Sequence, residues 1–387
     1  RIDASCDLYG FCGGCQLQHI TYEGQLSLKT QKVKDVIERI GHQNPELVKP
    51  ALGPKDPWAY RNKMQMPVGG SKGDIQMGFY AMGSHDIVQG TNCPIQDEGN
   101  NIIAQACYQI AKEFDIEPYN EHTGKGILRH VIGRIGQSGW MIILVTATDH
   151  LPHQEKWVEK LTERIPQVET IVHNVNNKRT NVILGSKNHI LYGDGTITDH
   201  IKDLQFTLSP HSFFQVNPEQ TTVLYDQALA YADLKGDETV IDAYCGTGTI
   251  SLFLAHKAKH VIGIEIVEPS IINARENAQR NGYDNTEFIV ADAAVEMPKL
   301  YKAGVRPDVI VFDPIRAGCK EEVLTSAAGM EPKRIVYVSC NPATMARDIE
   351  ILTHYGYELQ EVQPVDMFPM TAHVEAVALL TRNAVTQ

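Results

Sequence analysis

The stretch that decides the fold lies in the second half of the chain and reads Val240-Ile241-Asp242-Ala243-Tyr244-Cys245-Gly246-Thr247-Gly248-Thr249-Ile250. Its apolar start predicts a buried strand, its glycines predict a tight turn, and its end predicts the first turn of a helix. Glycines in such a turn allow a ligand to approach the backbone at the helix N-terminus. From about Glu219 onward, predicted strands and helices alternate, which indicates a parallel, doubly wound α/β sheet.

A carboxylate follows these glycines at the interval expected for a nucleoside ligand. The second strand, Val261–Ile266, carries Glu265 near its end, where an acidic residue suits a ribose diol. Position 251 is serine rather than the third glycine of a dinucleotide-binding loop. This difference favours S-adenosyl-L-methionine, which has no pyrophosphate. The next strand ends before Asp292, which either contacts the adenine or caps the helix that follows.

Two further segments are candidates for the same cofactor pocket. The fourth strand, Asp308–Phe312, is followed by Asp313, which is either a functional carboxylate beside a ligand cleft or a turn residue. The apolar segment Ser212–Asn217 contains the polar residue Gln215. This segment either lines the cofactor pocket or links two domains.

A cysteine stands at the end of the fifth strand. The run Ile335–Val338 predicts a buried strand, and Cys340 follows it shortly. The next residues, Asn341-Pro342, are expected neither to extend the strand nor to begin a helix at once. In open α/β sheets, ligands bind at the carboxyl ends of the strands, so this thiol is a candidate nucleophile. The alternative is a buried, inert cysteine.

A second chemical candidate enters the last strand pair, which is expected near Leu359–Pro364 and Glu375–Leu380. Glu375 begins an apolar run there. A carboxylate in that position is either an acid or base in a low-dielectric cleft or a charge on an edge strand.

The first half of the chain is predicted to form an α+β domain, residues 1–205, followed by the α/β domain, residues 206–387. An amphipathic helix over residues 24–41 is a candidate to pack on the second domain. Short strand-like runs alternate with turns, which indicates an antiparallel sheet with a few helices such as Gln96–Phe114. The expected strands include Lys63–Val68, Gln76–Tyr80, Val131–Arg134, Met141–Thr146 and Thr170–Asn174.

Four cysteines of the first half have the spacing of a metal site. Cys6, Cys12 and Cys15 are spaced C-x5-C-x2-C, and Cys93 lies far along the chain. Three thiolates on a short loop and a remote fourth can enclose a tetrahedral zinc ion or a cubic iron–sulfur cluster. The spacing does not choose between these two, and unrelated thiols are the third alternative.

Composition excludes some classes of protein. The net charge is −12 and no apolar run reaches membrane-spanning length, which argues against a general polyanion binder and against a membrane protein. No signal peptide opens the chain, so the eight cysteines are interpreted as metal ligands or catalytic thiols rather than disulfides. We expect a cytoplasmic protein.

Together these motifs resemble the RNA 5-methyluridine (uracil-C5) methyltransferase family, specifically its iron–sulfur-containing 23S rRNA branch. The resemblance covers nearly the whole chain and rests on the C-x5-C-G-G-C-Q loop with Cys93, Ser212–Asn217, Asp242–Gly248, Asp313–Gly318, Ser339–Pro342 and His373–Glu375. Many members have Asp-Pro-Pro-Arg where this chain has Ile315, a change not expected to abolish donor binding. Members usually carry an N-terminal TRAM domain. This chain starts at the cysteine loop, so we expect that domain to be absent from it.

The resemblance implies a Rossmann-like methyltransferase domain that uses S-adenosyl-L-methionine, and it assigns roles to the motifs. Cys340 would be the nucleophile that adds to carbon 6 of uracil, and Glu375 would be the base that removes the proton from carbon 5. A [4Fe–4S] cluster would be held by Cys6, Cys12, Cys15 and Cys93. The methyl donor would be contacted by Gln215, Tyr244, Gly246, Thr249, Glu265, Asp292 and Asp313.

The substrate implied by the resemblance is a single-stranded or flipped-out uridine of 23S rRNA, bound by a monomer. Basic residues expected to contact its phosphates are Lys29, Lys32, Lys34, Arg39, Lys125, Arg129, His130, Arg134, Lys178 and Arg179. Alternatives are the tRNA-specific member of the family, an iron–sulfur protein for radical chemistry and a non-catalytic RNA-binding or RNA-folding module. Four protein cysteines leave no open iron for radical chemistry, and Cys340 with Glu375 count against the non-catalytic alternative.

Overall fold

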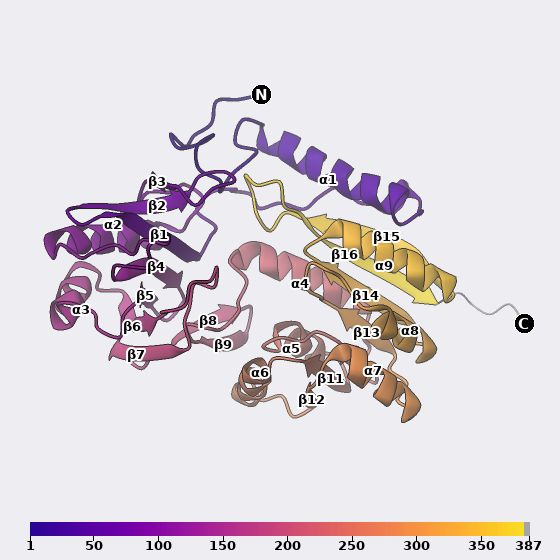
Figure 1. The fold of residues 1–387 in the computed structure, drawn as a ribbon. Helices are drawn as coiled ribbons and strands as arrows, with labels where there is room; N and C mark the ends of the chain where they lie inside the picture. Colours follow the sequence, from indigo (N-terminus) through magenta and orange to yellow (C-terminus); the bar gives the residue numbers. More distant parts are fainter. Residues whose placement is uncertain (383–387) are drawn as a thin grey trace, which may run out of the picture. The chain divides into compact units, whose positions relative to one another are not determined.

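The computed structural model describes residues 1–382 and divides the chain into two compact units, each with a seven-stranded sheet (Figure 1). The first unit combines Arg1–Thr21 with Asp56–Pro218, and the second combines Tyr22–Lys55 with Glu219–Gln387. The sequence predicted instead two consecutive domains that meet between residues 205 and 206. Within residues 1–382, no helix is both long and apolar enough to span a membrane.

The sheet of the first unit is mixed, with the strand order β3-β2-β1-β4-β5-β6-β7. Its strands are β1 (Lys63–Ser71), β2 (Asp74–Tyr80), β3 (Ile87–Gln89), β4 (Leu128–Ile135), β5 (Trp140–Thr146), β6 (Val168–Val175) and β7 (Lys187–Tyr192). Neighbouring strands are antiparallel except β5 and β6, which are parallel because helix α3 (Gln154–Arg164) forms a crossover between them. The prediction of a wholly antiparallel sheet is wrong at this pair, while the five expected strands are confirmed.

Helix α2 (Glu98–Glu113) begins two residues later than predicted, because Asp97 is its N-cap. The Asp97 side chain accepts a hydrogen bond from the Gly99 amide at 2.8 Å. The core of this unit includes Ile103 of α2 and Trp157 of α3. A separate hairpin, β8 (Ile197–Ile201) and β9 (Leu204–Leu208), follows the sheet.

The sheet of the second unit has the order β12-β11-β10-β13-β14-β16-β15. Its strands are β10 (Thr239–Asp242), β11 (His260–Glu265), β12 (Thr286–Val290), β13 (Val309–Phe312), β14 (Arg334–Ser339), β15 (Tyr357–Val365) and β16 (Glu375–Arg382). Strands β10 to β14 are parallel, and β16 runs antiparallel to both β14 and β15. The predicted doubly wound sheet is confirmed, with its topological switch point between β10 and β13.

The helices of this unit are α1 (Tyr22–Arg39), α4 (Pro218–Ala232), α5 (Thr249–Ala255), α6 (Glu268–Arg280), α7 (Ala293–Lys302), α8 (Glu321–Gly329) and α9 (Pro342–His354), with a short 3-10 turn η1 (Pro45–Leu47). Helix α1 corresponds to the helix expected over residues 24–41. Its residues Val33 and Ile37 are fully buried in the core that the sheet forms with α7, α8 and α9. A segment from early in the chain thus completes the second core.

Helix α9 begins immediately after the fifth parallel strand, which corrects the sequence analysis. Asn341 is the N-cap and accepts a hydrogen bond from the Ala343 amide at 3.3 Å, and Pro342 is the first helical residue. Proline is favoured there because that position has no intrahelical hydrogen bond to donate. The pair Asn341-Pro342 therefore starts a helix at once, and the turn that holds Cys340 is short.

Candidate active site

The sheet topology of the second unit brings the predicted nucleophile and base together. Parallel strands β10 to β14 end at one edge of the sheet, and the antiparallel strand β16 begins at that same edge. Ser339 pairs with Ala376 at the end of the β14–β16 register, and Cys340 and Glu375 are the next residues of these two segments. The Glu375 charge acts on the Cys340 thiol, so the two groups lie near each other at this edge.

The electrostatic environment of the Cys340 thiol shows the same proximity. Burial raises the pKa of Cys340, and the charges of Glu375 and Asp313 raise it further, while Arg316 opposes them. The thiol is therefore held protonated in the free protein. A nucleophile in this position needs to lose its proton as the substrate binds.

Two carboxyl groups beside the thiol titrate near neutral pH. Glu375 is 5% exposed, and burial together with the neighbouring Asp313 raises its pKa to about 8, against the effect of Arg316. Burial raises the pKa of Asp313 to about 7, and Asp242 acts in the same direction. A group with a pKa near the working pH both accepts and releases protons efficiently. Glu375 has the proton affinity that a base in this pocket requires.

A cavity of about 210 Å³ opens at Cys340. Its walls include Arg316, Lys32 and His373 as well as the cysteine. Arg316 and His373 belong to motifs shared with the methyltransferase family, but no role was predicted for either residue. The charges of Arg316 and Lys32 lower the pKa of His373, after the larger effect of burial. The wall is thus cationic or neutral, which suits a group that carries negative charge.

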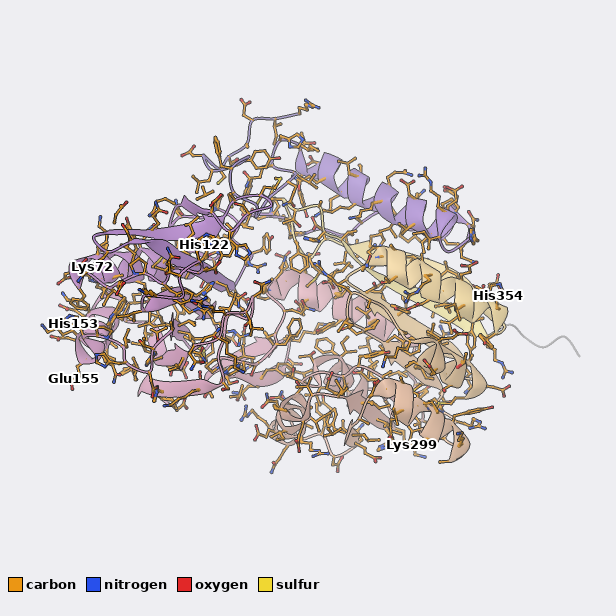
Figure 2. All side chains as sticks on the ribbon, viewed as in Figure 1. Lys72, His122, His153, Glu155, Lys299 and His354 are labelled. Atoms are coloured by element: carbon orange, nitrogen blue, oxygen red, sulfur yellow. The ribbon has the colours of Figure 1, made fainter. Side chains whose placement is uncertain are left out.

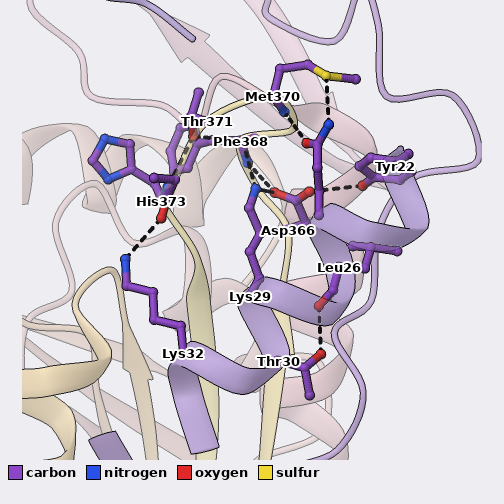
Figure 3. A network of polar contacts seen from close by, with 12 residues as sticks. Tyr22, Leu26, Lys29, Thr30, Lys32, Asp366, Phe368, Met370, Thr371 and His373 are labelled. Atoms are coloured by element: carbon purple, nitrogen blue, oxygen red, sulfur yellow. Dashed lines mark hydrogen bonds and ion pairs between the residues drawn. The ribbon is translucent and has the colours of Figure 1, made fainter. Parts of the chain in front are cut away.

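Helix α1 supports this wall through a buried ion pair (Figure 3). The Lys29 ammonium lies 2.6 Å from Asp366 Oδ1 and donates to the Phe368 carbonyl at 3.1 Å. Lys32 donates to the Ala372 carbonyl at 3.0 Å, three residues before Glu375. Lys29 is only 2% exposed, so its predicted contact with RNA phosphate is wrong, since its charge is satisfied inside the unit.

The glycine turn after β10 has the geometry expected of a cofactor loop. Gly246 and Gly248 have φ angles of +52° and +81°, which favour glycine. At Gly246 an added Cβ would meet nothing within 4 Å, so the backbone is open on that side. Glu265 accepts hydrogen bonds from the Gly246 amide at 3.2 Å and the Val267 amide at 2.9 Å. The carboxylate thereby ties the loop to the end of β11.

The other donor-binding candidates lie along this same edge of the sheet. Asp292 follows β12, caps α7 by accepting from the Ala294 amide at 2.9 Å, and pairs with Lys320 at 2.9 Å. Thr249 begins α5, and Tyr244 follows β10. Burial raises the pKa of the Tyr244 phenol and Cys319 raises it further, which places the hydroxyl group beside that thiol. Both roles considered for Asp292 are compatible, because a capping carboxylate keeps free lone pairs.

A buried carboxylate near the switch point has an unpaired oxygen. Asp242, the last residue of β10, is fully buried, and its Oδ2 accepts from the Ser251 hydroxyl at 2.6 Å. Within residues 1–382, Asp242 Oδ1 has no hydrogen-bond partner. Burial raises the pKa of Asp242 to about 6. Serine at position 251, which replaced the third glycine of the dinucleotide pattern, thus has a structural role of its own.

Gln215 belongs to the first unit, so its predicted contact with the methyl donor stays a prediction.

Three basic residues of the first unit were expected to contact RNA phosphates but are buried. Arg129, His130 and Arg134 are each at most 6% exposed. Arg134 donates to the carbonyl of Ser209 at 2.8 Å and to that of Ser212. These side chains are therefore not a solvated row of phosphate contacts.

The four predicted cluster cysteines come together in the first unit. Burial raises the pKa of Cys93 to about 12, and Cys15 and Cys6 act in the same direction. Burial also raises the pKa of Cys15, with further effects from Cys12 and Cys6. Within the described part of the chain, no group of three or more His, Cys, Asp or Glu side chains is placed to hold a metal ion. The thiols lie near one another, and the metal site expected on them stays a prediction.

Comparison with known proteins assigns the family. The family described as tRNA (Uracil-5-)-methyltransferase matches residues 141–383. An uncharacterized RNA methyltransferase of Bacillus cereus is 53% identical over 384 residues, covering 99% of this chain and 84% of that protein. Another uncharacterized RNA methyltransferase, from Halalkalibacterium halodurans, is 51% identical over 382 residues, covering 98% of this chain and 83% of that protein.

Among solved structures, the tRNA (uracil-54, C5)-methyltransferase of Pyrococcus abyssi, in complex with S-adenosyl-L-homocysteine, is similar to this chain. The TM-score is 0.79 and the sequence identity is 27%, with 96% of this chain and 86% of that chain covered. The family match, the relatives and the arrangement of Cys340 and Glu375 agree with one another. The chain belongs to the family of RNA uracil-5-methyltransferases.

Proposed function

We propose that this protein transfers a methyl group to carbon 5 of uridine in 23S rRNA through a covalent bond between Cys340 and carbon 6 of the base. The observation that carries the proposal is the pairing of β14 with β16, which ends beside Cys340 and the buried Glu375. Carbon 5 of uracil is a poor nucleophile. Addition of a thiolate to carbon 6 makes carbon 5 nucleophilic, and a proton acceptor then removes the proton of carbon 5 so that the product can be released.

Once the Cys340 thiol has lost its proton to solvent, the thiolate adds to carbon 6, forming a carbon–sulfur bond and an enolate. Carbon 5 of the enolate takes the methyl group of S-adenosyl-L-methionine; the sulfur–methyl bond of the donor breaks and S-adenosyl-L-homocysteine leaves. The Glu375 carboxylate removes the proton from carbon 5, and elimination breaks the carbon–sulfur bond and returns the thiolate. Arg316, in the cavity wall, stabilises the negative charge on both the thiolate and the carboxylate.

The methyl donor would lie along the carboxyl edge of β10 to β13. Gly246 gives it an open approach to the backbone, and Glu265 is at the strand end where a ribose is bound in related folds. Tyr244 and Asp313 lie in the loops directly after β10 and β13, and Asp292 lies between β12 and α7. The complex of the P. abyssi protein with S-adenosyl-L-homocysteine supports this ligand. Isothermal titration with S-adenosyl-L-homocysteine tests it, and Glu265→Gln is expected to weaken binding at least tenfold.

The proposal includes a [4Fe–4S] cluster, which rests on the cysteine motif. A cubic cluster binds each of four thiolates to a different iron. Besides burial, the nearby Cys6 raises the pKa of Cys12, Cys15 and Cys93, so the four thiols lie near one another. The role assigned to the cluster is structural. Anaerobic purification followed by iron and sulfide analysis is expected to give four of each per chain.

Transfer RNA is the second candidate substrate, and the similarity to the P. abyssi tRNA methyltransferase favours it. The cysteine motif favours 23S rRNA. The deciding experiment incubates the enzyme with tritiated methyl donor and either 23S rRNA or unmodified tRNA, then maps 5-methyluridine by mass spectrometry. Methylation of tRNA alone would refute the rRNA assignment, and methylation of neither RNA by the cluster-loaded protein would refute the activity.

A further inference from the structure

The first unit contains a cavity of about 280 Å³ that has no part in the steps above. Strands β1 to β4 and the loop after α2 form its walls, and this loop includes His122, which is labelled in Figure 2. Its volume lies just below the range for small-molecule pockets, roughly 300–1,000 Å³. A single planar group of nucleobase size fits such a space, and a duplex does not.

A β-bulge directs two consecutive residues of β4 to this cavity. Leu128 pairs with Thr146 and His130 pairs with Val145, which leaves Arg129 as an extra residue on β4. Consecutive residues of a regular strand face opposite sides of the sheet, and a bulge re-aims one of them. Arg129 and His130 consequently both line the cavity.

These two side chains have polar atoms without a partner. Arg129 is 4% exposed and His130 is 6% exposed. Arg129 Nε and His130 Nδ1 form no hydrogen bond to any other described residue. Arg129 is nevertheless held firmly, because its Nη1 donates to the Asn176 carbonyl at 2.6 Å and to the Lys178 carbonyl at 2.8 Å. Both atoms are buried from solvent, and leaving buried polar atoms unpaired is costly.

Aromatic side chains form part of the remaining wall, beside residues such as Val68, Gly69 and Gln76. The guanidinium of Arg129 lies over the Tyr119 ring, 4.4 Å from its centroid. The rings of Tyr80 and His85 are stacked, with centroids 4.9 Å apart and an interplanar angle of 20°. Glu121 accepts from Tyr80 at 3.3 Å and pairs with His85 Nδ1 at 2.8 Å. Flat side chains thus stand beside groups that can bond the edge of a ring.

The charges in the wall argue against a site for a simple anion. Arg129 is cationic, and Glu121 is anionic since its interactions with His85 and Tyr80 lower its pKa against the effect of burial. Burial lowers the pKa of His130 to about 4, and Arg129 acts in the same direction, so this imidazole is neutral. A phosphate would meet the Glu121 carboxylate. A neutral ring could donate hydrogen bonds to the Glu121 carboxylate and accept them from Arg129.

We propose that this cavity binds one unpaired base of the RNA substrate, at a nucleotide other than the methylated uridine. The inference rests on the proposed function for the identity of the ligand. Unpaired bases of RNA are recognised by stacking on aromatic or guanidinium planes and by hydrogen bonds to their edges. The cavity provides both, and it would select RNAs with a single-stranded segment beside the target.

The test measures binding of the full chain to fluorescent 12-nucleotide strands of oligo(A), oligo(C) and oligo(G), and to the same backbone with abasic sugars. The wild type is expected to prefer at least one base-containing strand by about 5- to 100-fold. His130→Leu and Glu121→Gln are expected to lose most of this preference and to leave binding of the abasic strand unchanged. Glu121 is 44% exposed, so its variant is expected to fold normally. His150→Ala, at an exposed position of the same unit, is the matched control.

Methylation of 23S rRNA and tRNA is measured on the same preparations. If no RNA is methylated while the base preference disappears in both variants, the proposed activity fails and the base-binding cavity stands. If methylation proceeds and both variants keep the wild-type preference, the inference is overturned. An equal loss of affinity for base-containing and abasic strands would also overturn it, because the cavity would then bind backbone rather than a base.

Discussion

Replacing Glu375 with glutamine is expected to stabilise the fold and to stop release of the product. The carboxyl is 5% exposed and has a pKa of about 8 because burial and Asp313 disfavour its charged form. Glutamine has the same shape and no charge. The variant therefore removes the proton acceptor near Cys340, together with the cost of ionising a buried group.

The magnitude follows from the proton balance. An unfolded chain loses the Glu375 proton near pH 4.3, whereas the folded chain keeps it up to about pH 8. Between these values the folded state binds the extra proton, so wild-type stability falls as pH rises, by about 1.4 kcal/mol per pH unit. The loss accumulates to about 5 kcal/mol and is complete above pH 8. Glutamine does not titrate, so the advantage of the variant is expected to grow by about 3 kcal/mol between pH 5.5 and 8.5.

Urea denaturation at pH 5.5, 7.0 and 8.5 measures this difference. Glu358→Gln, at an exposed position of β15, is the matched control and is expected to show no such trend. The same Glu375→Gln protein, incubated with methyl donor and substrate RNA, is expected to accumulate a complex that survives denaturing electrophoresis. A stability difference that does not change with pH would refute the burial argument. Free methylated RNA at the wild-type rate would refute the assigned base.

Three further outcomes test the site. Cys340→Ala is expected to abolish methyl transfer and the covalent complex while RNA affinity, measured by filter binding, stays within about twofold of wild type. Arg316→Gln is expected to move the pH profile of methylation upward by about one unit, since Arg316 lowers the pKa of both Cys340 and Glu375; an unchanged profile would contradict this. Lys29→Met leaves Asp366 buried without its counter-charge and is expected to cost about 3–5 kcal/mol in urea denaturation, with Lys34→Met, which removes the ion pair to the exposed Glu46 from the same helix, as the control.

Local sequence patterns predicted most of the secondary structure and the sheet edge that carries the candidate site. Apolar runs such as Ile335–Val338 form strands wherever they are buried, and the glycines after Asp242 require a turn. Parallel strands necessarily end at one edge, so Glu265, Asp313 and Cys340 could be assigned to it from their positions alone. The cap formed by Asn341 was missed because the following proline was interpreted as a helix breaker, although it is favoured as a first helical residue.

The doubly wound sheet, the glycine turn and the candidate site residues could thus be predicted from local patterns along the chain. Packing was needed to show that α1 completes the second core, that Lys29 is paired inside it and that Arg129 and Arg134 are buried. It also decided the proton affinity of Glu375, since burial and charge depend on segments far apart in sequence. The sequence gives the type of each residue, whereas its solvent exposure and its contacts depend on how distant segments pack together.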